Sequence, residues 1–209
     1  MMDDLKITKL LPEHSRKVAE LHISGIHKGF ISSLGIDFVA ALYEAIAESK
    51  FGFGFVTQKD GKIMCFAAFT TNLNALYKSV ILKNGLRLAF KLAGKMFSFG
   101  RIKKVFETMF YPSRIKKMNL PSAEFLSMVV VEEARGKGLA TAMMWKGFAE
   151  CARRGEKKVK ILARADLKAI NKMYEKYGFE LVGQIENHGV VSNVYVTETD
   201  RKQVDKKTL

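Results

Sequence analysis

One segment, residues 129–140, constrains the fold of this chain more than any other. It begins with three consecutive valines, typical of a buried strand, and ends in Leu139-Ala140, where a helical pattern begins. The turn between them contains two glycines, Gly136 and Gly138. The first amides of a helix have no acceptor within the helix, and the helix dipole adds partial positive charge there. This turn therefore suits a phosphate or a pyrophosphate, although its spacing fits neither a P-loop nor a dinucleotide fingerprint.

The remaining pattern alternates strands with helices over 209 residues, a length that fits one domain. Alternation and apolar runs predict strands at 5–8, 51–57, 62–70, 123–131, 159–163, 179–185 and 190–197. Helical spacing predicts a helix from Pro12 to Gly25, a second after Gly35, and two more at 138–153 and 168–177. A hairpin turn is expected at Asp60-Gly61 and a frayed polar tail at 199–209. This order predicts an α/β (α+β) fold, a sheet with helices on both faces.

Most of the positive charge is local. The chain has a net charge of +14, and residues 71–120 contribute +10 of it, with eleven basic side chains and one acidic. Their spacing predicts a basic helical insert of amphipathic helices. Three roles remain open for it: a lid or substrate wall, a peripheral membrane contact through 74–117, and a solvated surface without function. Nucleic acid is not expected as a partner, because base-stacking aromatic residues and recognition motifs are lacking.

The cysteines and the N-terminus favour a cytoplasmic protein. Cys65 and Cys151 are far apart and have no neighbours at metal-ligand spacing, which excludes a disulfide scaffold and a cysteine-based zinc site. The first residues are acidic where a signal peptide needs basic ones. No apolar run reaches the roughly 18–20 residues of a membrane span.

Two motifs carry a resemblance to a known family. Arg135-Gly136-Lys137-Gly138-Leu139-Ala140 matches the R/Q-x-x-G-x-G/A signature of the GNAT (N-acetyltransferase) superfamily, and Tyr174-Glu175-Lys176-Tyr177-Gly178-Phe179 resembles its Y-x-K-x-G-F segment. The resemblance covers about a third of the chain, residues 123–196. It implies a GNAT-like mixed, mostly antiparallel sheet, with the basic insert between the third and fourth strands. It also implies acetyl-CoA as the cofactor and allows a homodimer.

The resemblance further implies which residues hold acetyl-CoA. Main-chain groups of Met128, Val129 and Val130 would bind the pantetheine arm where the central strand diverges from its neighbour. The amides of Arg135, Gly136, Lys137, Gly138, Leu139 and Ala140 would hold the pyrophosphate. The chain departs from the family at Leu167, where many members have an asparagine; Asn171 either replaces it or faces solvent.

Catalytic and acceptor residues follow from the same resemblance. Tyr174 is the expected general acid, with packing on a short helix as the alternative. Glu124 is a candidate base, with a charged residue at a strand start as the alternative. His27, Phe30 and His188 would contact the acceptor. The expected reaction is direct attack of an acceptor amine on the thioester in a ternary complex. The acceptor would be a small molecule, and an anionic one would suit the basic insert. The alternatives are a non-catalytic acyl-CoA sensor and a membrane-surface acyltransferase.

Overall fold

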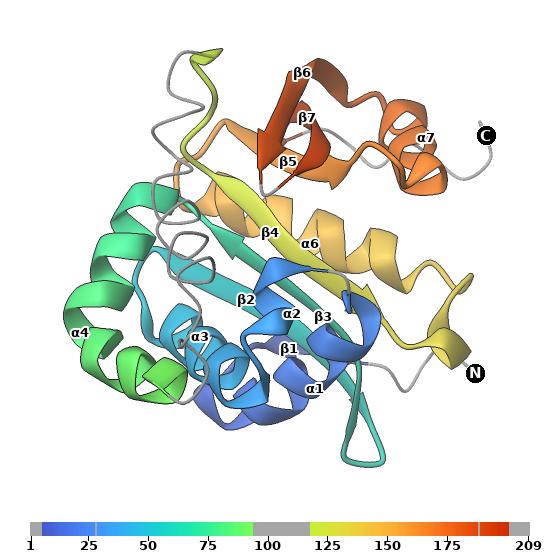
Figure 1. Ribbon diagram of the computed structural model, residues 1–209. Coiled ribbons are helices and arrows are strands. Elements are labelled where there is room, and N and C mark those ends of the chain that lie inside the picture. Colours follow the sequence, from blue (N-terminus) through green and yellow to red (C-terminus); the bar gives the residue numbers. More distant parts are fainter. Residues whose placement is uncertain (1–5, 28, 94–117, 188, 201–209) are drawn as a thin grey trace.

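The chain folds around one mixed sheet, which Figure 1 shows crossing the molecule between two groups of helices. The computed structural model describes residues 6–27, 29–93, 118–187 and 189–200. Within these ranges the strand order is β1-β2-β3-β4-β5-β7-β6. The strands are β1 (Ile7–Lys9), β2 (Gly52–Lys59), β3 (Lys62–Thr70), β4 (Glu124–Val130), β5 (Lys158–Arg164), β6 (Glu180–Asn187) and β7 (Val190–Glu198). Among these seven described strands, only β4 and β5 pair in parallel. The predicted mixed, mostly antiparallel sheet is confirmed.

Helices cover both faces of the sheet. The helices are α1 (Ser15–Gly25), α2 (Phe30–Ser33), α3 (Ile36–Glu48), α4 (Leu73–Ala93), α6 (Leu139–Arg153) and α7 (Lys168–Lys176), with short 3-10 turns η1 (Pro12–His14) and η3 (Glu132–Ala134). One hydrophobic cluster joins α1, α3 and α4 to one side of the sheet, which we call the α3 face. A second cluster joins α6 and α7 to the other side, the α6 face.

The α6 face is built on stacked aromatic rings. Phe69 of β3 has no exposed surface, and its ring centroid lies 5.3 Å from that of Phe53 and 4.6 Å from that of Phe125. Helix α6 presses directly on this stack, because a Cβ atom placed on Gly147 would lie 2.0 Å from the Phe69 ring. Gly147 therefore sets how closely α6 approaches β3.

Most element boundaries agree with the sequence pattern to within two residues. The hairpin at Asp60-Gly61 is confirmed by positive φ angles of 51° and 73°. The short helix α2 was not expected and lies inside the predicted break at 25–35. The expected fraying at Thr199 is wrong, because its N–H donates to the Lys157 carbonyl and its hydroxyl to the Glu156 carbonyl.

The basic insert is described only in part. Its first helix is α4, between β3 and β4. The second predicted helix and the membrane contact through 74–117 fall largely in residues 94–117, outside the described ranges, as does the tail from 201. Among the described helices, none combines the length and the apolar character needed to cross a bilayer.

Candidate active site

The parallel strands β4 and β5 separate soon after they meet. Their ladder consists of two positions, Glu124 opposite Lys160 and Phe125 opposite Ile161, although β4 continues to Val130. A bulge in β4 accompanies the separation: Phe69 pairs with Phe125 and Ala68 with Ser127, so Leu126 has no partner on β3. A bulge bends its strand and increases the local twist, which turns β4 away from β5.

The divergence leaves main-chain groups of β4 unpaired on the β5 side. Val131 donates its N–H to Met64 of β3, and hydrogen-bonding direction alternates along a strand. The peptide groups of Val130 and Met128 therefore point toward β5, as the cofactor prediction requires. Val129 does not fit that prediction, because it pairs with Phe66 of β3. Its side chain is buried on the α3 face.

The loop after β4 forms a cradle of amides. Gly136 and Gly138 have φ angles of +73° and +76°, a conformation that side chains with a Cβ atom rarely adopt. Among the described residues, no hydrogen-bond acceptor is within reach of the main-chain N–H groups of residues 136–141. Arg135 differs from its prediction, because its N–H donates to the Glu132 carbonyl. Five of the six predicted amides, those of Gly136, Lys137, Gly138, Leu139 and Ala140, thus remain available to an anion.

Two cationic side chains brace this cradle. Arg135 Nε donates to the Val130 carbonyl at 3.2 Å, and Lys137 Nζ donates to the Glu133 carbonyl at 2.6 Å. Both bonds hold the charges beside the N-terminus of α6. The positive ends of these side chains and of the helix dipole therefore favour the same kind of ligand, a bound anion.

Tyr174 lies on α7, with its ring in the cluster of the α6 face. Its side chain is buried, with ring centroids 5.2 Å from Phe179 and 5.4 Å from Tyr195. The described residues provide no hydrogen-bond partner for its hydroxyl, and this oxygen is not among the fully enclosed unpartnered atoms. Burial raises the pKa of Tyr174 above its ordinary value. The phenol is therefore protonated at neutral pH, with its O–H free to donate.

Asn171 is a structural residue of the same helix. Its amide nitrogen donates to the carbonyls of Arg164 and Leu167, at 2.8 and 2.9 Å. Its oxygen accepts from Asn193 at 2.8 Å and from Tyr195 at 3.1 Å. These four bonds use its full capacity, so Asn171 neither faces solvent nor has a group left for the cofactor. It fixes α7 against β5 and β7.

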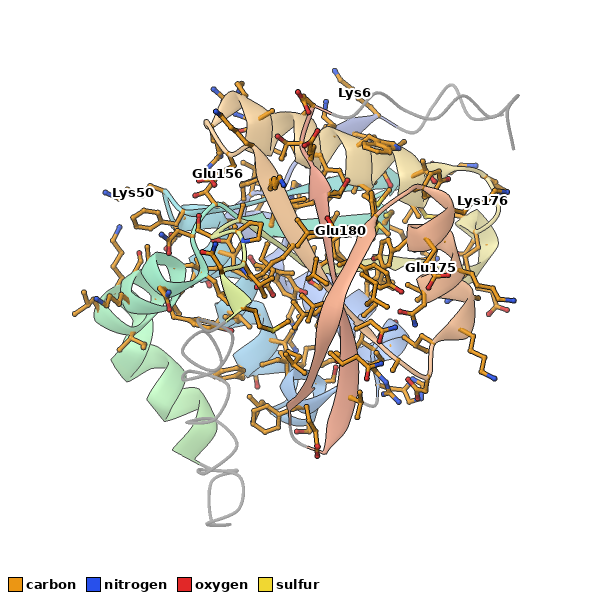
Figure 2. The ribbon with its side chains drawn as sticks, turned by 90° about the horizontal axis from the view of Figure 1, so that it is seen from above. Lys6, Lys50, Glu156, Glu175, Lys176 and Glu180 are labelled. Atoms are coloured by element: carbon orange, nitrogen blue, oxygen red, sulfur yellow. The ribbon has the colours of Figure 1, made fainter. Side chains whose placement is uncertain are left out.

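The same network reaches the exposed end of α7. The single hydroxyl proton of Tyr195 is shared between Asn171 and Glu175 Oε1, 3.3 Å away; Figure 2 labels Glu175. This contact and the bonds of Asn171 hold the turn of α7 that carries Tyr174.

Glu124 is buried at the point where β4 and β5 part. Alternation places its side chain on the α3 face, opposite Phe125, which packs under α6. Its exposed fraction is 7%, and Lys160 Nζ lies 3.3 Å from its Oε2. Burial raises the pKa of Glu124, and the charge of Lys160 opposes that rise. A raised pKa suits a general base, so this environment favours the catalytic interpretation.

The predicted acceptor residues are only partly described. His27 is exposed in the loop between α1 and α2, and Phe30 is half-buried at the start of α2, on the α3 face. His188 lies outside the described residues. Glu124 and Phe30 thus share one face of the sheet, whereas Tyr174 lies on the other.

A hydrogen-bonded chain beside the bulge was not predicted. The hydroxyl of Tyr43 in α3 lies 2.7 Å from His22 Nδ1 in α1 and 2.8 Å from the Ser127 hydroxyl in β4. Burial lowers the pKa of His22 to about 4, so its ring is neutral at pH 7. This chain ties both helices to β4. Helical spacing could have located the burial of His22 but not its distant partners.

Fold and site together combine a helix N-terminus that has free amides with a strand that diverges from its parallel neighbour. Comparison with known proteins shows what this arrangement is similar to. A family model described as an acetyltransferase (GNAT) domain matches residues 94–181. A search of curated proteins gives no match. The family-model match contains both motifs identified in the sequence, so this part of the chain is similar to GNAT acetyltransferases.

Solved structures show the same fold over almost the whole chain. An N-acetyltransferase from Staphylococcus aureus has a TM-score of 0.61 at 16% identity, covering 95% of this chain and 100% of that one. The ribosomal-protein-S18-alanine N-acetyltransferase of Escherichia coli has a TM-score of 0.59 at 12% identity, covering 96% and 97%. Arabidopsis thaliana NAA60, solved in complex with acetyl-CoA, has a TM-score of 0.58 at 12% identity, covering 93% and 98%.

Proposed function

We propose that this protein is an acetyl-CoA-dependent N-acetyltransferase, in which an acceptor amine attacks the thioester directly. The observation that carries the proposal is a run of unpaired main-chain groups. It begins at Met128 and at the N–H of Val130, where β4 has left β5, and continues in the amides of residues 136–140; the Val130 carbonyl is taken by Arg135. A ligand with an extended polar arm and a diphosphate matches this run. Acetyl-CoA has both.

Each part of the run has a distinct role in this proposal. The peptide groups of Met128 and Val130 hold the pantetheine arm in an extended conformation, as a neighbouring strand would. The amides at the start of α6 hold the diphosphate. A β4 amide also donates to the thioester oxygen as negative charge develops on it; loss of such a donor typically costs about 2.7–4 kcal/mol of barrier.

The proposed acid and base lie on opposite faces of the sheet. Glu124 lies on the α3 face with Phe30, one of the residues expected to contact the acceptor, and Tyr174 lies on the α6 face. A thioester threaded between the two strands would meet the amine from one face and release its thiolate toward the other. This arrangement supports direct attack, because nucleophile and leaving group need separate proton carriers.

The properties of Tyr174 fit protonation of a leaving thiolate. Its raised pKa keeps the proton on the phenol until a strong base appears. A thiolate becomes such a base when it is buried: within this core, burial raises the pKa of the Cys65 and Cys151 thiols to about 12. A desolvated coenzyme thiolate beside Tyr174 would thus compete well for the phenolic proton.

The acceptor in this proposal is a small-molecule amine, and the protein acts in the cytoplasm, where its two free, buried cysteines stay reduced. Membrane contact through the basic insert and homodimer formation remain predictions.

A matched pair of glycine variants tests the cofactor site. Gly136 and Gly61 both have φ of +73°, and a Cβ atom at either would meet nothing within 4 Å. Alanine therefore causes similar backbone strain at both, but only Gly136 shapes the amide cradle. By calorimetry, we expect Gly136→Ala to weaken acetyl-CoA binding about tenfold or more, roughly 1.4 kcal/mol, and Gly61→Ala to leave it unchanged.

Activity then separates an enzyme from a sensor. With a panel of small amines and detection of free thiol, Tyr174→Phe should lower kcat about 100-fold or more while acetyl-CoA affinity is retained. Failure of the wild-type protein to bind acetyl-CoA would refute the proposal. Tight binding with no transfer to any amine would instead favour the acyl-CoA sensor.

A further inference from the structure

Lys160 stands out as a charged side chain in the interior that the proposed chemistry has not yet used. It lies on β5 directly opposite Glu124, at the first of the two positions where β4 and β5 pair. Only 2% of it is exposed. Burying an ion pair rarely improves stability over an apolar pair of the same size, because both charges lose their hydration. Stability alone is therefore a weak explanation for this pair.

The hydrogen bonds of Lys160 go to the main chain. Its Nζ donates to the Pro121 carbonyl at 2.7 Å and to the Ser122 carbonyl at 3.4 Å. These two bonds fix the ammonium group just before the start of β4. Its position is therefore set independently of the Glu124 carboxylate.

The contact between Glu124 and Lys160 is mainly one of charge. Lys160 Nζ lies 3.3 Å from Glu124 Oε2, but among the described residues no well-aligned hydrogen-bond donor reaches this enclosed oxygen. Lys160 lowers the pKa of Glu124, against the rise caused by burial. Within the described residues, the titratable groups that face Glu124 are Lys160 from β5 and Tyr77 from α4. The phenol of Tyr77 is neutral, since burial and Glu124 both raise its pKa.

We propose that Lys160 is a positioning residue that keeps Glu124 anionic at neutral pH while leaving its carboxylate free to accept the proton of the acceptor amine. This inference rests on the proposed function. In the step concerned, an acceptor ammonium gives one proton to Glu124, and the neutral nitrogen then forms its bond to the thioester carbon. The carbon–sulfur bond breaks, the thiolate takes the proton of Tyr174, and the new amide nitrogen loses its second proton to solvent. Tyr174 and Glu124 then return to their starting states by exchange with solvent, with one proton released overall.

Titration of the carboxylate itself provides the test. The full-length protein is labelled with carbon-13 at the glutamate δ position, and the Glu124 signal is assigned by its loss in Glu124→Gln. In the wild type, we expect this signal to be that of an ionised carboxylate at pH 7, because the charge of Lys160 opposes the rise caused by burial. In Lys160→Met, we expect its pKa to rise by one to three units, the usual effect of an opposite charge at this distance. Lys158→Met is the matched control, because Lys158 lies two residues away on the same strand but is exposed, so it should leave the titration unchanged.

Further variants keep the test decisive. If Lys160→Met does not fold, Lys160→Gln removes the charge and keeps a donor for the two carbonyls, and the same rise is expected. Lys160→Arg should restore a titration near that of the wild type. A Glu124 pKa that is unchanged when the charge at position 160 is lost would overturn the inference, as would a wild-type carboxylate still protonated at pH 8.

The catalytic consequence is a displaced pH profile. With the best amine of the panel, the acid limb of kcat/KM should move upward in Lys160→Gln by the shift seen in the titration. A purely structural lysine would instead lower kcat/KM equally at every pH. Acetyl-CoA calorimetry separates the two proposals, because a protein that does not bind acetyl-CoA refutes the function while the Glu124 titration remains interpretable.

Discussion

The contact between Gly147 and Phe69 leads to a prediction in which the usual effect of a substitution changes sign. Glycine inside a helix is normally unfavourable, and its replacement by alanine stabilises an exposed helix by up to about 1 kcal/mol. At position 147, the new Cβ would lie 2.0, 2.3 and 2.5 Å from three atoms of the Phe69 ring. Ordinary contact needs at least 3.4 Å, so ring and helix must separate by about 1.4 Å.

The surroundings of Phe69 leave little room for that separation. The ring is stacked between Phe53 and Phe125, and Phe148 of α6 approaches its edge with centroids 6.2 Å apart. Overpacking of a filled core costs about 1–3 kcal/mol, and the rigid stack favours the upper end of that range. After the gain in helix propensity is subtracted, Gly147→Ala should lower the free energy of unfolding by about 2 kcal/mol.

Gly85 provides the matched control. It lies within α4, where a Cβ would meet only a side-chain atom of Ile81 at 3.7 Å. Gly85→Ala should therefore raise the free energy of unfolding by up to about 1 kcal/mol. Urea unfolding of both variants measures the two effects. A Gly147→Ala protein as stable as the wild type, or more stable, would refute the reasoning.

A double-mutant cycle locates the cause of the loss. Phe69→Leu removes ring atoms from the contact, so the cost of Gly147→Ala should shrink in that background. Because Phe69 pairs with Phe125 where the bulge begins, Gly147→Ala should also weaken acetyl-CoA binding.

Three further predictions concern single side chains. The lowered pKa of His22, about 4 against 6.5 in the unfolded chain, means that the unfolded state takes up a proton first as pH falls. Stability should decrease between pH 6.5 and 4 by up to about 3 kcal/mol; His22→Gln should remove that dependence in urea titrations at several pH values. Glu150 has its pKa lowered to about 2, first by its hydrogen bond to Arg153. Its stabilising effect should be complete above about pH 4.3 and lost as pH falls toward 2, so Glu150→Gln should differ from the wild type at pH 6 and converge with it near pH 2. Asn171→Ala breaks the four bonds that hold α7, so it should lower both thermal stability and kcat, whereas Tyr174→Phe should lower kcat alone.

The sequence predicted those features of the fold and site that depend on local chemistry. The two glycines after three valines located the cradle of unpaired amides, because positive φ and a helix start can both be predicted from neighbouring residues. Strand alternation relative to Phe125 is enough to assign Glu124 to the opposite face of the sheet. The bulge at Leu126 has no such local mark, so the assignment of Val129 to the cofactor could not be corrected in advance.

Buried polar contacts could not be predicted because their partners are distant in the chain. Asn171 is satisfied by Asn193 and Tyr195, which come from β7. In the sequence, Lys160 cannot be distinguished from a surface lysine. The fold places it against Glu124, which lies thirty-six residues earlier in the chain. In both cases the role of the side chain is set by strand pairing.

Binding through main-chain groups, as proposed for acetyl-CoA, has an evolutionary consequence. Apart from the two glycines and the buried Val129, Ala134 and Leu139, most side chains in residues 128–140 can change without altering the main-chain donors, so mutations at those positions are weakly penalised. Nearly all of the ancestral amino acids can then be replaced while the backbone dihedral angles of the segment stay the same. This freedom to drift agrees with structures that are 12–16% identical yet align over more than nine-tenths of the chain.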